Sequence, residues 1–269
     1  MTESDSPAET DEVAELASDL AARAAALLIE RRGSATGSIG TKTSITDMVS
    51  DVDRASESLV VTGIRRARPG DAILAEEGSA EQGTSGWRWV IDPLDGTVNY
   101  LYGLPAYAVS IAVEHHGRAL VGVVVDPEHG ETFTAVRGRG ATRNGVPIAT
   151  SAESDLAVAL IGTGFSYDAE RRSRQATVLT RVVPRVRDIR RAGAASIDLC
   201  WVACGRLDGY YEHGLAPWDF AAGALIASEA GGYTGDLRGG PPSAEVAVAA
   251  GARLFAGLCE LLVEVGAGP

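Results

Sequence analysis

The sequence predicts a layered protein of mixed type, with an α+β N-terminal half and an α/β C-terminal half that join near residue 150. The first half combines two amphipathic helical stretches with several short β-rich runs, and the second half alternates strands with helices. No internal repeat or low-complexity linker interrupts the chain. We therefore expect one compact unit in which residues 1–9 form a disordered tail, residues 10–150 the first half and residues 151–269 the second.

The first predicted element is an amphipathic helix from Asp11 to Arg32. Its apolar residues recur at helical spacing, at Val13, Leu16, Leu20, Ala24, Leu27 and Leu28. The Gly-, Ser- and Thr-rich segment from Gly33 to Ser44 follows, and we expect it to be a mobile loop that carries Lys42. A second helix is predicted from Asp51 to Arg66.

Short strands dominate the next part of the chain. Ala72–Ala75 is a predicted strand that ends at Glu76-Glu77, and Trp89–Ile91 is another that ends at Asp92-Pro93, because proline cannot continue a central ladder. The runs YAVSIAV, ALVGVVV and ETFTAV predict antiparallel strands, and Asn144-Gly145 predicts a tight hairpin.

The second half alternates the two kinds of element. We expect strands at LAVALIGTG, Gly209–Glu212 and AEVAVAA. We expect helices at Asp168–Val183, Ala194–Cys204, Pro217–Ala230 and Arg253–Val265.

Composition narrows the class of protein. The chain has 269 residues and a formal net charge of −12, so it is a poor candidate for binding nucleic acid, which requires clustered Lys and Arg. No apolar run reaches the length of a membrane span, and the acidic N-terminus is unlike a signal peptide, so we expect a cytoplasmic protein. The three cysteines imply no disulfide framework, and Cys200 and Cys204 are interpreted as core residues.

Acidic residues gather where predicted elements end or begin. Glu76 follows one strand, Asp92 and Asp95 follow another, and Asp219 begins a helix. Carboxylates without His or Cys favour a hard cation, Mg²⁺ above Zn²⁺. Each group taken alone has an ordinary explanation, such as a solvated glutamate pair or an aspartate that favours the first turn of a helix.

The motif DPLDGT, residues 92–97, is the most specific of these features. Pro93 turns the chain so that Asp92 and Asp95 can point toward one place, and Gly96 allows a ligand to approach the backbone closely. Thr97 stands at what looks like a helix N-terminus, where free N–H groups suit a phosphate. An Asp-rich turn with a side-chain cap is the alternative interpretation of this motif by itself.

In combination, these residues resemble the inositol monophosphatase family. WVIDPLDGTVNYLYGLP is similar to the first signature of that family, PWDFAAGALIASEAGG to the second, and RAGAASIDLCWVACGRLDGYYE between them also matches. The resemblance extends from the first helix to the last. Pro217 and Phe220 depart from the usual pattern, which could reshape the edge of the pocket without removing a ligand.

The resemblance implies a sandwich of α-β-α-β-α layers, a homodimer and a site with two or three Mg²⁺ ions. Glu76, Asp92 and the Leu94 carbonyl would hold one ion, and Asp92, Asp95 and Asp219 a second. Glu76 would also reach a third ion through water. The catalytic residues would be Asp53, Thr97 and Glu76, with Asp53 and Thr97 orienting the attacking water. The N–H groups of Gly96 and Thr97 would bind phosphate, and Lys42 would lie near the metals. Gly193, Ala194, Ala195 and Glu212 would contact a polyol.

The implied reaction is hydrolysis of inositol monophosphate to inositol and phosphate by water, with lithium as an inhibitor. Fructose 1,6-bisphosphate, histidinol phosphate, 3'-phosphoadenosine 5'-phosphate and NADP remain rival substrates within the same fold. Glu212 favours a compact polyol, because its carboxylate can accept hydrogen bonds from ring hydroxyls. A regulatory protein that keeps the fold is the alternative from another functional class.

Overall fold

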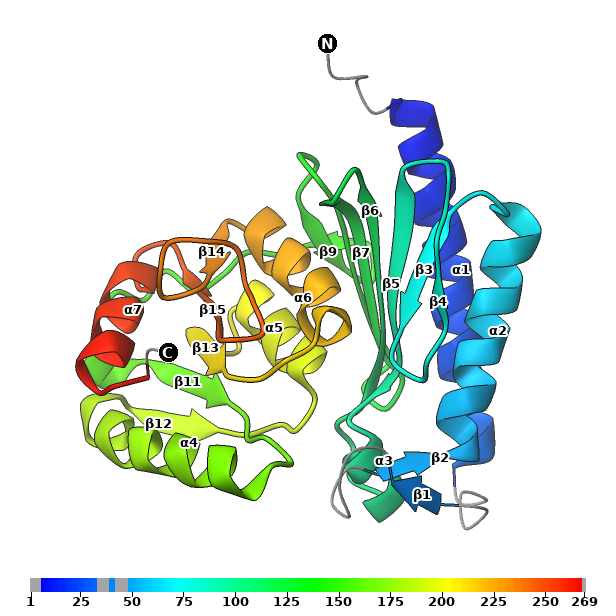
Figure 1. Ribbon diagram of the computed structural model, residues 1–269. Helices are drawn as coiled ribbons and strands as arrows, with labels where there is room; N and C mark the ends of the chain where they lie inside the picture. The colour runs from blue at the N-terminus through cyan, green and yellow to red at the C-terminus, as the bar shows by residue number, and fades with distance from the viewer. Residues whose placement is uncertain (1–5, 33–38, 42–47, 268–269) are drawn as a thin grey trace.

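The computed structural model describes residues 6–32, 39–41 and 48–267. Within these ranges the chain forms five stacked layers, which Figure 1 shows edge-on: two helices, a large sheet, two helices, a smaller sheet and two outer helices. The predicted α-β-α-β-α sandwich is confirmed. The change from the large sheet to the small one falls between residues 147 and 160, close to the predicted junction.

The large sheet has the strand order β10-β9-β8-β7-β6-β5-β3-β4. All its neighbouring strands are antiparallel except β3 and β5, which are parallel. Its strands are β3 (Ala72–Ala75), β4 (Ala80–Glu81), β5 (Trp87–Asp95), β6 (Ala108–His115), β7 (Arg118–Asp126), β8 (Glu131–Val136), β9 (Ala141–Arg143) and β10 (Val146–Pro147). Asn144 and Gly145, both at positive φ, form the predicted hairpin turn between β9 and β10.

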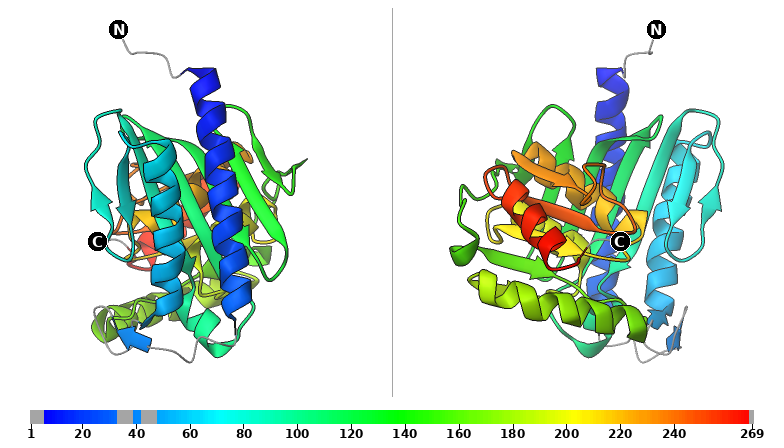
Figure 2. Two further views of the ribbon diagram at one scale, coloured as in Figure 1. Left: turned by 90° about the vertical axis from the view of Figure 1, so that its right-hand side faces the viewer. Right: turned by 60° about the vertical axis from the view of Figure 1, so that its left-hand side comes forward.

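Helices α1 (Pro7–Arg31) and α2 (Asp51–Ala67) cover one face of this sheet and lie side by side, as the left view of Figure 2 shows. The residues of α1 that the sequence places on one stripe, including Val13, Leu20 and Leu28, are fully buried against the sheet and α2. This face of the sheet and its two helices form the first hydrophobic core.

The small sheet has the order β12-β11-β13-β15-β14. Its strands are β11 (Leu160–Thr163), β12 (Asp188–Arg190), β13 (Gly209–Glu212), β14 (Gly232–Gly235) and β15 (Ala247–Gly251). Helices α5 (Ala195–Ala203) and α6 (Pro217–Glu229) lie between the two sheets, and α4 (Ala169–Val182) and α7 (Phe255–Glu264) lie outside. Because α5 and α6 are covered on both sides, they are apolar almost all round.

The remaining elements are short. Helix α3 (Thr97–Tyr102) follows β5, and β1 (Ile39–Thr41) pairs with β2 (Met48–Ser50). Single 3₁₀ turns span Leu156–Val158 and Val183–Arg185. No helix in the described ranges is both long and apolar enough to cross a membrane.

Several predicted boundaries differ from the observed ones. Helix α1 begins at Pro7, inside the segment expected to be a tail, because proline suits the first helical turn, where its missing N–H has no partner to lose. The predicted strand LAVALIGTG is a 3₁₀ turn followed by the shorter β11. Strands β1, β2, β4, β12 and β14 were not predicted, and β1 lies within the segment from Gly33 to Ser44 that was expected to be a loop.

The predicted end of the strand at Asp92 is wrong. Strand β5 runs through Pro93 to Asp95, and its pairing with β6 shifts register between Asp92 and Asp95. Because proline has no N–H to donate, it is tolerated at such a bulge, where the ladder is already interrupted.

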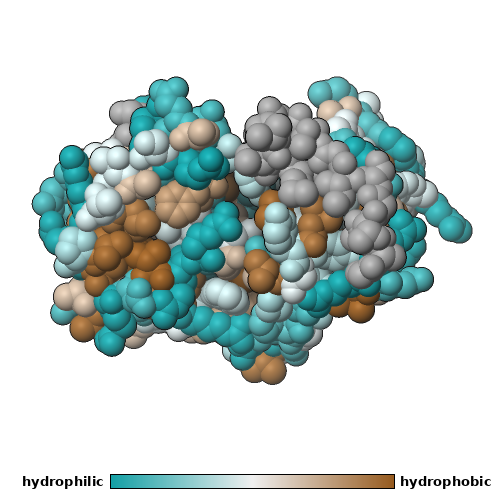
Figure 3. Space-filling view, turned by 90° about the horizontal axis from the view of Figure 1, so that it is seen from below, coloured by the Kyte–Doolittle hydropathy of each residue, from teal (hydrophilic) through white to brown (hydrophobic). Residues whose placement is uncertain are grey.

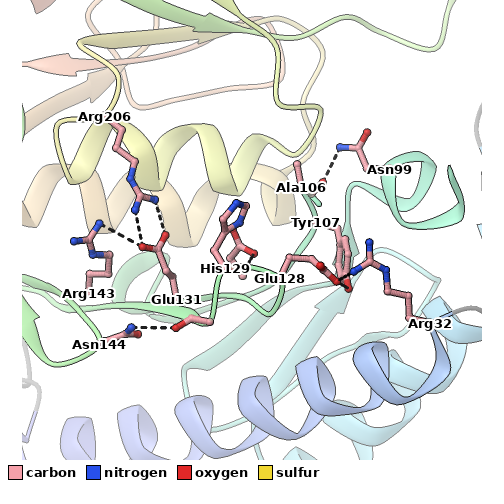
Figure 4. Close-up of polar contacts among 12 residues, drawn as sticks. Arg32, Asn99, Ala106, Tyr107, Glu128, His129, Glu131, Arg143, Asn144 and Arg206 are labelled. Atoms are coloured by element: carbon pink, nitrogen blue, oxygen red, sulfur yellow. Dashed lines mark hydrogen bonds and ion pairs between the residues drawn. The ribbon is translucent and has the colours of Figure 1, made fainter. Parts of the chain in front are cut away.

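The turn between β7 and β8, together with Glu131 at the start of β8, links distant parts of the molecule (Figure 4). Glu131 accepts hydrogen bonds of 2.5 and 2.6 Å from the guanidinium of Arg206, which follows α5, and lies 3.4 Å from that of Arg143. Glu128 on the same turn is paired with Arg32 at the end of α1 and accepts a 2.5 Å hydrogen bond from the Tyr107 hydroxyl. The turn therefore connects the first helix and the large sheet to the C-terminal half.

Candidate active site

Four acidic residues from three parts of the chain line one pocket between the two halves. Asp92 and Asp95 lie at the end of β5. Glu76 follows the parallel neighbour β3, and its backbone N–H donates to the Ile91 carbonyl at 3.2 Å. Asp219 is in the first turn of α6. Seen from below, the C-terminal half lies on the left and the N-terminal half on the right (Figure 3).

Each of the three aspartates has one oxygen fixed by a backbone N–H group. The Leu94 N–H donates to Asp92 Oδ1 at 3.0 Å, the Ala216 N–H to Asp219 Oδ2 at 2.6 Å, and the Ser196 N–H to Asp95 Oδ2 at 2.7 Å. These bonds set the orientation of each carboxyl group before any ligand arrives.

The carboxyl groups resist ionisation in this pocket. Burial, followed by the charges of Glu76, Asp95 and Asp219, raises the pKa of Asp92 well above its usual value. Burial raises the pKa of Asp95 to about 6, although hydrogen bonds from Ser196 oppose this. Burial and the neighbouring carboxylates also raise the pKa of Asp219. A site that concentrates negative charge in this way is stabilised by a cation.

The donor chemistry of the pocket fits a hard divalent ion. Its candidate ligands are carboxylate oxygens and the Leu94 carbonyl, and Arg191 is the one cationic side chain among the described residues that line it. As the side chains stand, no three His, Cys, Asp or Glu residues in the described ranges are arranged to hold a metal ion. The potential metal ligands therefore line the same pocket, but their side chains would have to adjust to coordinate an ion together.

Thr97 and Asp53 form a buried pair beside these carboxylates. The Thr97 hydroxyl lies 2.8 Å from Asp53 Oδ1 and 3.1 Å from the Leu94 carbonyl oxygen. Asp53 is fully buried, because its other oxygen caps α2 by accepting from the N–H of Ser50 at 2.9 Å and from its hydroxyl at 2.5 Å. Helix α2 thus places the carboxylate of Asp53 under the DPLDGT loop.

Gly96 shapes the loop between β5 and α3. Its φ is +89°, and a Cβ there would lie 2.8 Å from the Ala106 carbonyl oxygen and 3.2 Å from the Ala194 Cβ. Ala194 is buried against this glycine rather than lining the pocket, whereas Gly193 and Ala195 do line it. Ala194 therefore makes a packing contact between the two halves, and its contact with a polyol stays a prediction.

Glu212 lies at the end of β13, on the side of the pocket formed by the C-terminal half. The Tyr210 hydroxyl donates to its Oε2 at 2.7 Å, and burial raises the pKa of Glu212 to about 7. Gly164 makes room for it, since any Cβ at that position would overlap the Glu212 carboxyl group. The charge of Arg191 favours the ionised form of Glu212 and opposes this rise in its pKa.

The pocket also includes residues that sequence patterns alone did not single out. They are Gly164, Phe165, Tyr167, Arg191 and Leu215. The one available signal was Gly164-Phe165 at the end of the predicted strand LAVALIGTG, because ligands often bind beyond strand ends. Lys42, expected near the metals, lies outside the described residues.

Comparison with known proteins agrees with this arrangement. The sequence model of the inositol monophosphatase family matches residues 9–267. An inositol-1-monophosphatase from Mycobacterium bovis is 44% identical over 250 residues, which cover 86% of this chain and 85% of that protein. A Pseudomonas aeruginosa protein named Nus factor SuhB is 46% identical over 199 residues, covering 72% and 73% of the two chains.

A solved structure shares the whole architecture. The extragenic suppressor protein suhB from Bartonella henselae superposes with a TM-score of 0.89 at 35% identity, covering 93% of this chain and 98% of that one. Sequence and fold together show that this chain belongs to the inositol monophosphatase family and is a phosphatase of that type.

Proposed function

We propose that this protein is a Mg²⁺-dependent phosphomonoesterase whose leading substrate is inositol monophosphate. The observation that carries the proposal is the composition of one pocket. Glu76, Asp92, Asp95 and Asp219 line it together with Thr97, whose hydroxyl is bonded to Asp53, and Glu212 lies on the opposite half. The Mycobacterium bovis relative bears the name of this activity.

The metal ligands that we propose are Glu76, Asp92 and the Leu94 carbonyl for one ion, and Asp92, Asp95 and Asp219 for a second. Divalent cations in such a site neutralise the phosphate and lower the pKa of water. Their binding would also offset the burial and, after it, the mutual repulsion that raise the pKa values of Asp92 and Asp219.

The side chains of Thr97 and Asp53 would orient the attacking water. The Thr97 hydroxyl donates to Asp53 Oδ1 and keeps oxygen lone pairs that can accept from water. As the water oxygen bonds to phosphorus, the bond from phosphorus to the ester oxygen breaks. The proton that the water gives up is taken up by the departing alkoxide, so the products are the alcohol and phosphate. The N–H groups of Gly96 and Thr97 would hold phosphate oxygens.

The Glu212 carboxylate would select the polyol. Gly164 and Tyr210 fix its position, and an ionised carboxylate accepts strong hydrogen bonds from ring hydroxyls. Gly193 and Ala195 would form the adjoining wall.

Phosphate release from a substrate panel tests this assignment. The panel contains inositol 1-phosphate, fructose 1,6-bisphosphate, histidinol phosphate, 3'-phosphoadenosine 5'-phosphate and NADP, each with Mg²⁺. We expect the highest kcat/KM for inositol 1-phosphate. A higher value for another member would move the assignment to that substrate, and no release from any member would refute the phosphatase itself.

A role in a protein complex is a second candidate, favoured by the name of the Pseudomonas aeruginosa relative, Nus factor SuhB. An Asp92→Asn variant separates the two candidates. If it has no phosphatase activity yet restores the growth of a strain that lacks the gene, the biological role is independent of hydrolysis. Loss of both would tie the role to hydrolysis.

A further inference from the structure

Ser196 makes two short hydrogen bonds to Asp95. Its backbone N–H lies 2.7 Å from Asp95 Oδ2, and its hydroxyl oxygen lies 2.6 Å from the same atom. Ser196 is fully buried and does not line the pocket, whereas Asp95 does. The serine therefore touches the carboxylate from behind, on the side away from any ligand.

The contact joins the two halves of the molecule. Asp95 and Ser196 are 101 residues apart, and Ser196 lies in the first turn of α5, whose N–H groups have no partners within the helix. The approach of α5 is fixed independently by Asn99, whose side-chain amide donates to the Ala106 carbonyl at 2.6 Å and to the Ala192 carbonyl at 2.9 Å. The position of Ser196 is thus set by the packing of the halves.

We propose that Ser196 is a positioning residue whose hydroxyl holds Asp95 in the orientation that a bound cation requires. The inference rests on the proposed metal site. A hydrogen bond to an ionised acceptor is stronger than one between neutral groups, and two of them on one oxygen restrict rotation of the carboxyl group. Residues that hold a metal ligand from behind typically change metal affinity 10–100-fold when they are replaced.

The test is Mg²⁺ binding by the full chain, measured by calorimetry on the wild type and on Ser196→Ala. This variant removes the hydroxyl but keeps the backbone N–H. Thr163→Val is the matched control, because Thr163 is also buried and its hydroxyl donates to a backbone carbonyl, that of Tyr211, at 2.9 Å. Phosphate release at varied Mg²⁺ gives a second readout, and the melting temperature reports on folding.

We expect Ser196→Ala to weaken Mg²⁺ binding by roughly 10-fold or more and to raise the half-saturating Mg²⁺ concentration by a similar factor. At saturating Mg²⁺, KM for the substrate should stay within about twofold of the wild-type value. Thr163→Val should leave Mg²⁺ affinity unchanged, even if it lowers the melting temperature.

Mg²⁺ affinity in Ser196→Ala within about twofold of the wild-type value would overturn the inference, as would an equal loss in both variants. Failure of the wild type to bind Mg²⁺ would overturn it together with the proposed metal site. A wild type that binds Mg²⁺ but releases no phosphate would refute the proposed function alone, because the binding comparison still decides the role of Ser196.

Discussion

At the scale of single residues, the hydrogen bond between Thr97 and Asp53 is the feature most directly tied to chemistry. The pair is buried, and α2 supplies the carboxylate while the loop after β5 supplies the hydroxyl. We expect Thr97→Ala to lower kcat by about 100-fold or more, the size of a general acid–base contribution, with a much smaller change in KM. Steady-state kinetics with inositol 1-phosphate measure both, and a change confined to KM would place Thr97 in substrate binding only.

Glu212 is expected to act on the substrate rather than on the reaction. Its pKa is raised to about 7 by burial, so it is protonated below that pH and ionised above it. Only the ionised form accepts hydrogen bonds with both oxygens. The KM for inositol 1-phosphate should therefore fall as pH rises through about 7, and Glu212→Gln should abolish that fall and cost roughly 1–3 kcal/mol in kcat/KM at about pH 8.

A small phosphate ester without ring hydroxyls is the control for this prediction. It carries the same titrating phosphate but makes no contact with Glu212. The wild type and Glu212→Gln should therefore show the same dependence of KM on pH for this ester. If Glu212→Gln lowers kcat/KM equally for the two substrates, Glu212 does not contact the polyol.

At the scale of elements, the turn from β5 into α3 determines where the DPLDGT loop lies. Gly96 has φ +89° and approaches the Ala106 carbonyl, whereas Gly103, at the other end of α3, has φ +72° and open space within 4 Å of the place where a Cβ would stand. Gly96→Ala and Gly103→Ala should each lower the free energy of unfolding by about 1 kcal/mol, because alanine is strained in the left-handed backbone conformation. Gly96→Ala should cost more, because of the close approach, and should also reduce activity.

Urea unfolding of the two variants measures the costs, and phosphate release measures the activity. The excess cost at Gly96 reports the close contact alone, since the backbone strain is shared. If Gly96→Ala and Gly103→Ala lower the free energy of unfolding equally and have equal activity, the close approach of the Ala106 carbonyl does not constrain the loop.

The same elements show what the sequence could and could not predict. Asp92, Asp95 and Asp219 were predictable as a group, because residues at strand ends and helix starts are placed by local pattern. The extent of β5 was not predictable, since Pro93 is tolerated only through a register shift that the partner strand β6 allows. Strands β12 and β14, of three and four residues, are too short to show a clear alternation. Ser196 and Arg191 reach the site through packing between the halves, which no local pattern encodes.

At the scale of the whole molecule, the pocket requires two halves held in a fixed relation. Glu131 and Arg206 connect them across the β7–β8 turn, and hydrogen bonding to Arg206 lowers the pKa of Glu131. We expect Glu131→Gln to lower the free energy of unfolding by about 1–3 kcal/mol near neutral pH. A lowered pKa stabilises the fold above the unfolded value of about 4.3, and this stabilisation is lost as pH falls through the folded pKa.

Thermal unfolding measured from about pH 7 to about pH 3 should give melting temperatures for the wild type and Glu131→Gln that become equal at the lowest pH. Glu264→Gln is the control, because its ion pair with Arg185 is exposed and lies within the C-terminal half. That variant should differ little from the wild type at any pH. If the melting temperature of Glu131→Gln lies below that of the wild type by the same amount at every pH, the charge of Glu131 does not contribute to holding the two halves together.

Hydrolysis is expected to depend on cations bound in the pocket that Glu76, Asp92, Asp95 and Asp219 line. The most direct measurement is phosphate release from inositol 1-phosphate by protein freed of metal with a chelator, as Mg²⁺ is titrated back. The wild type should be inactive at first and recover fully, with Ca²⁺ and Li⁺ inhibiting, and Asp219→Asn should need far more Mg²⁺ and lose activity on every substrate. Full activity of the wild type in excess chelator would show that hydrolysis does not depend on bound cations.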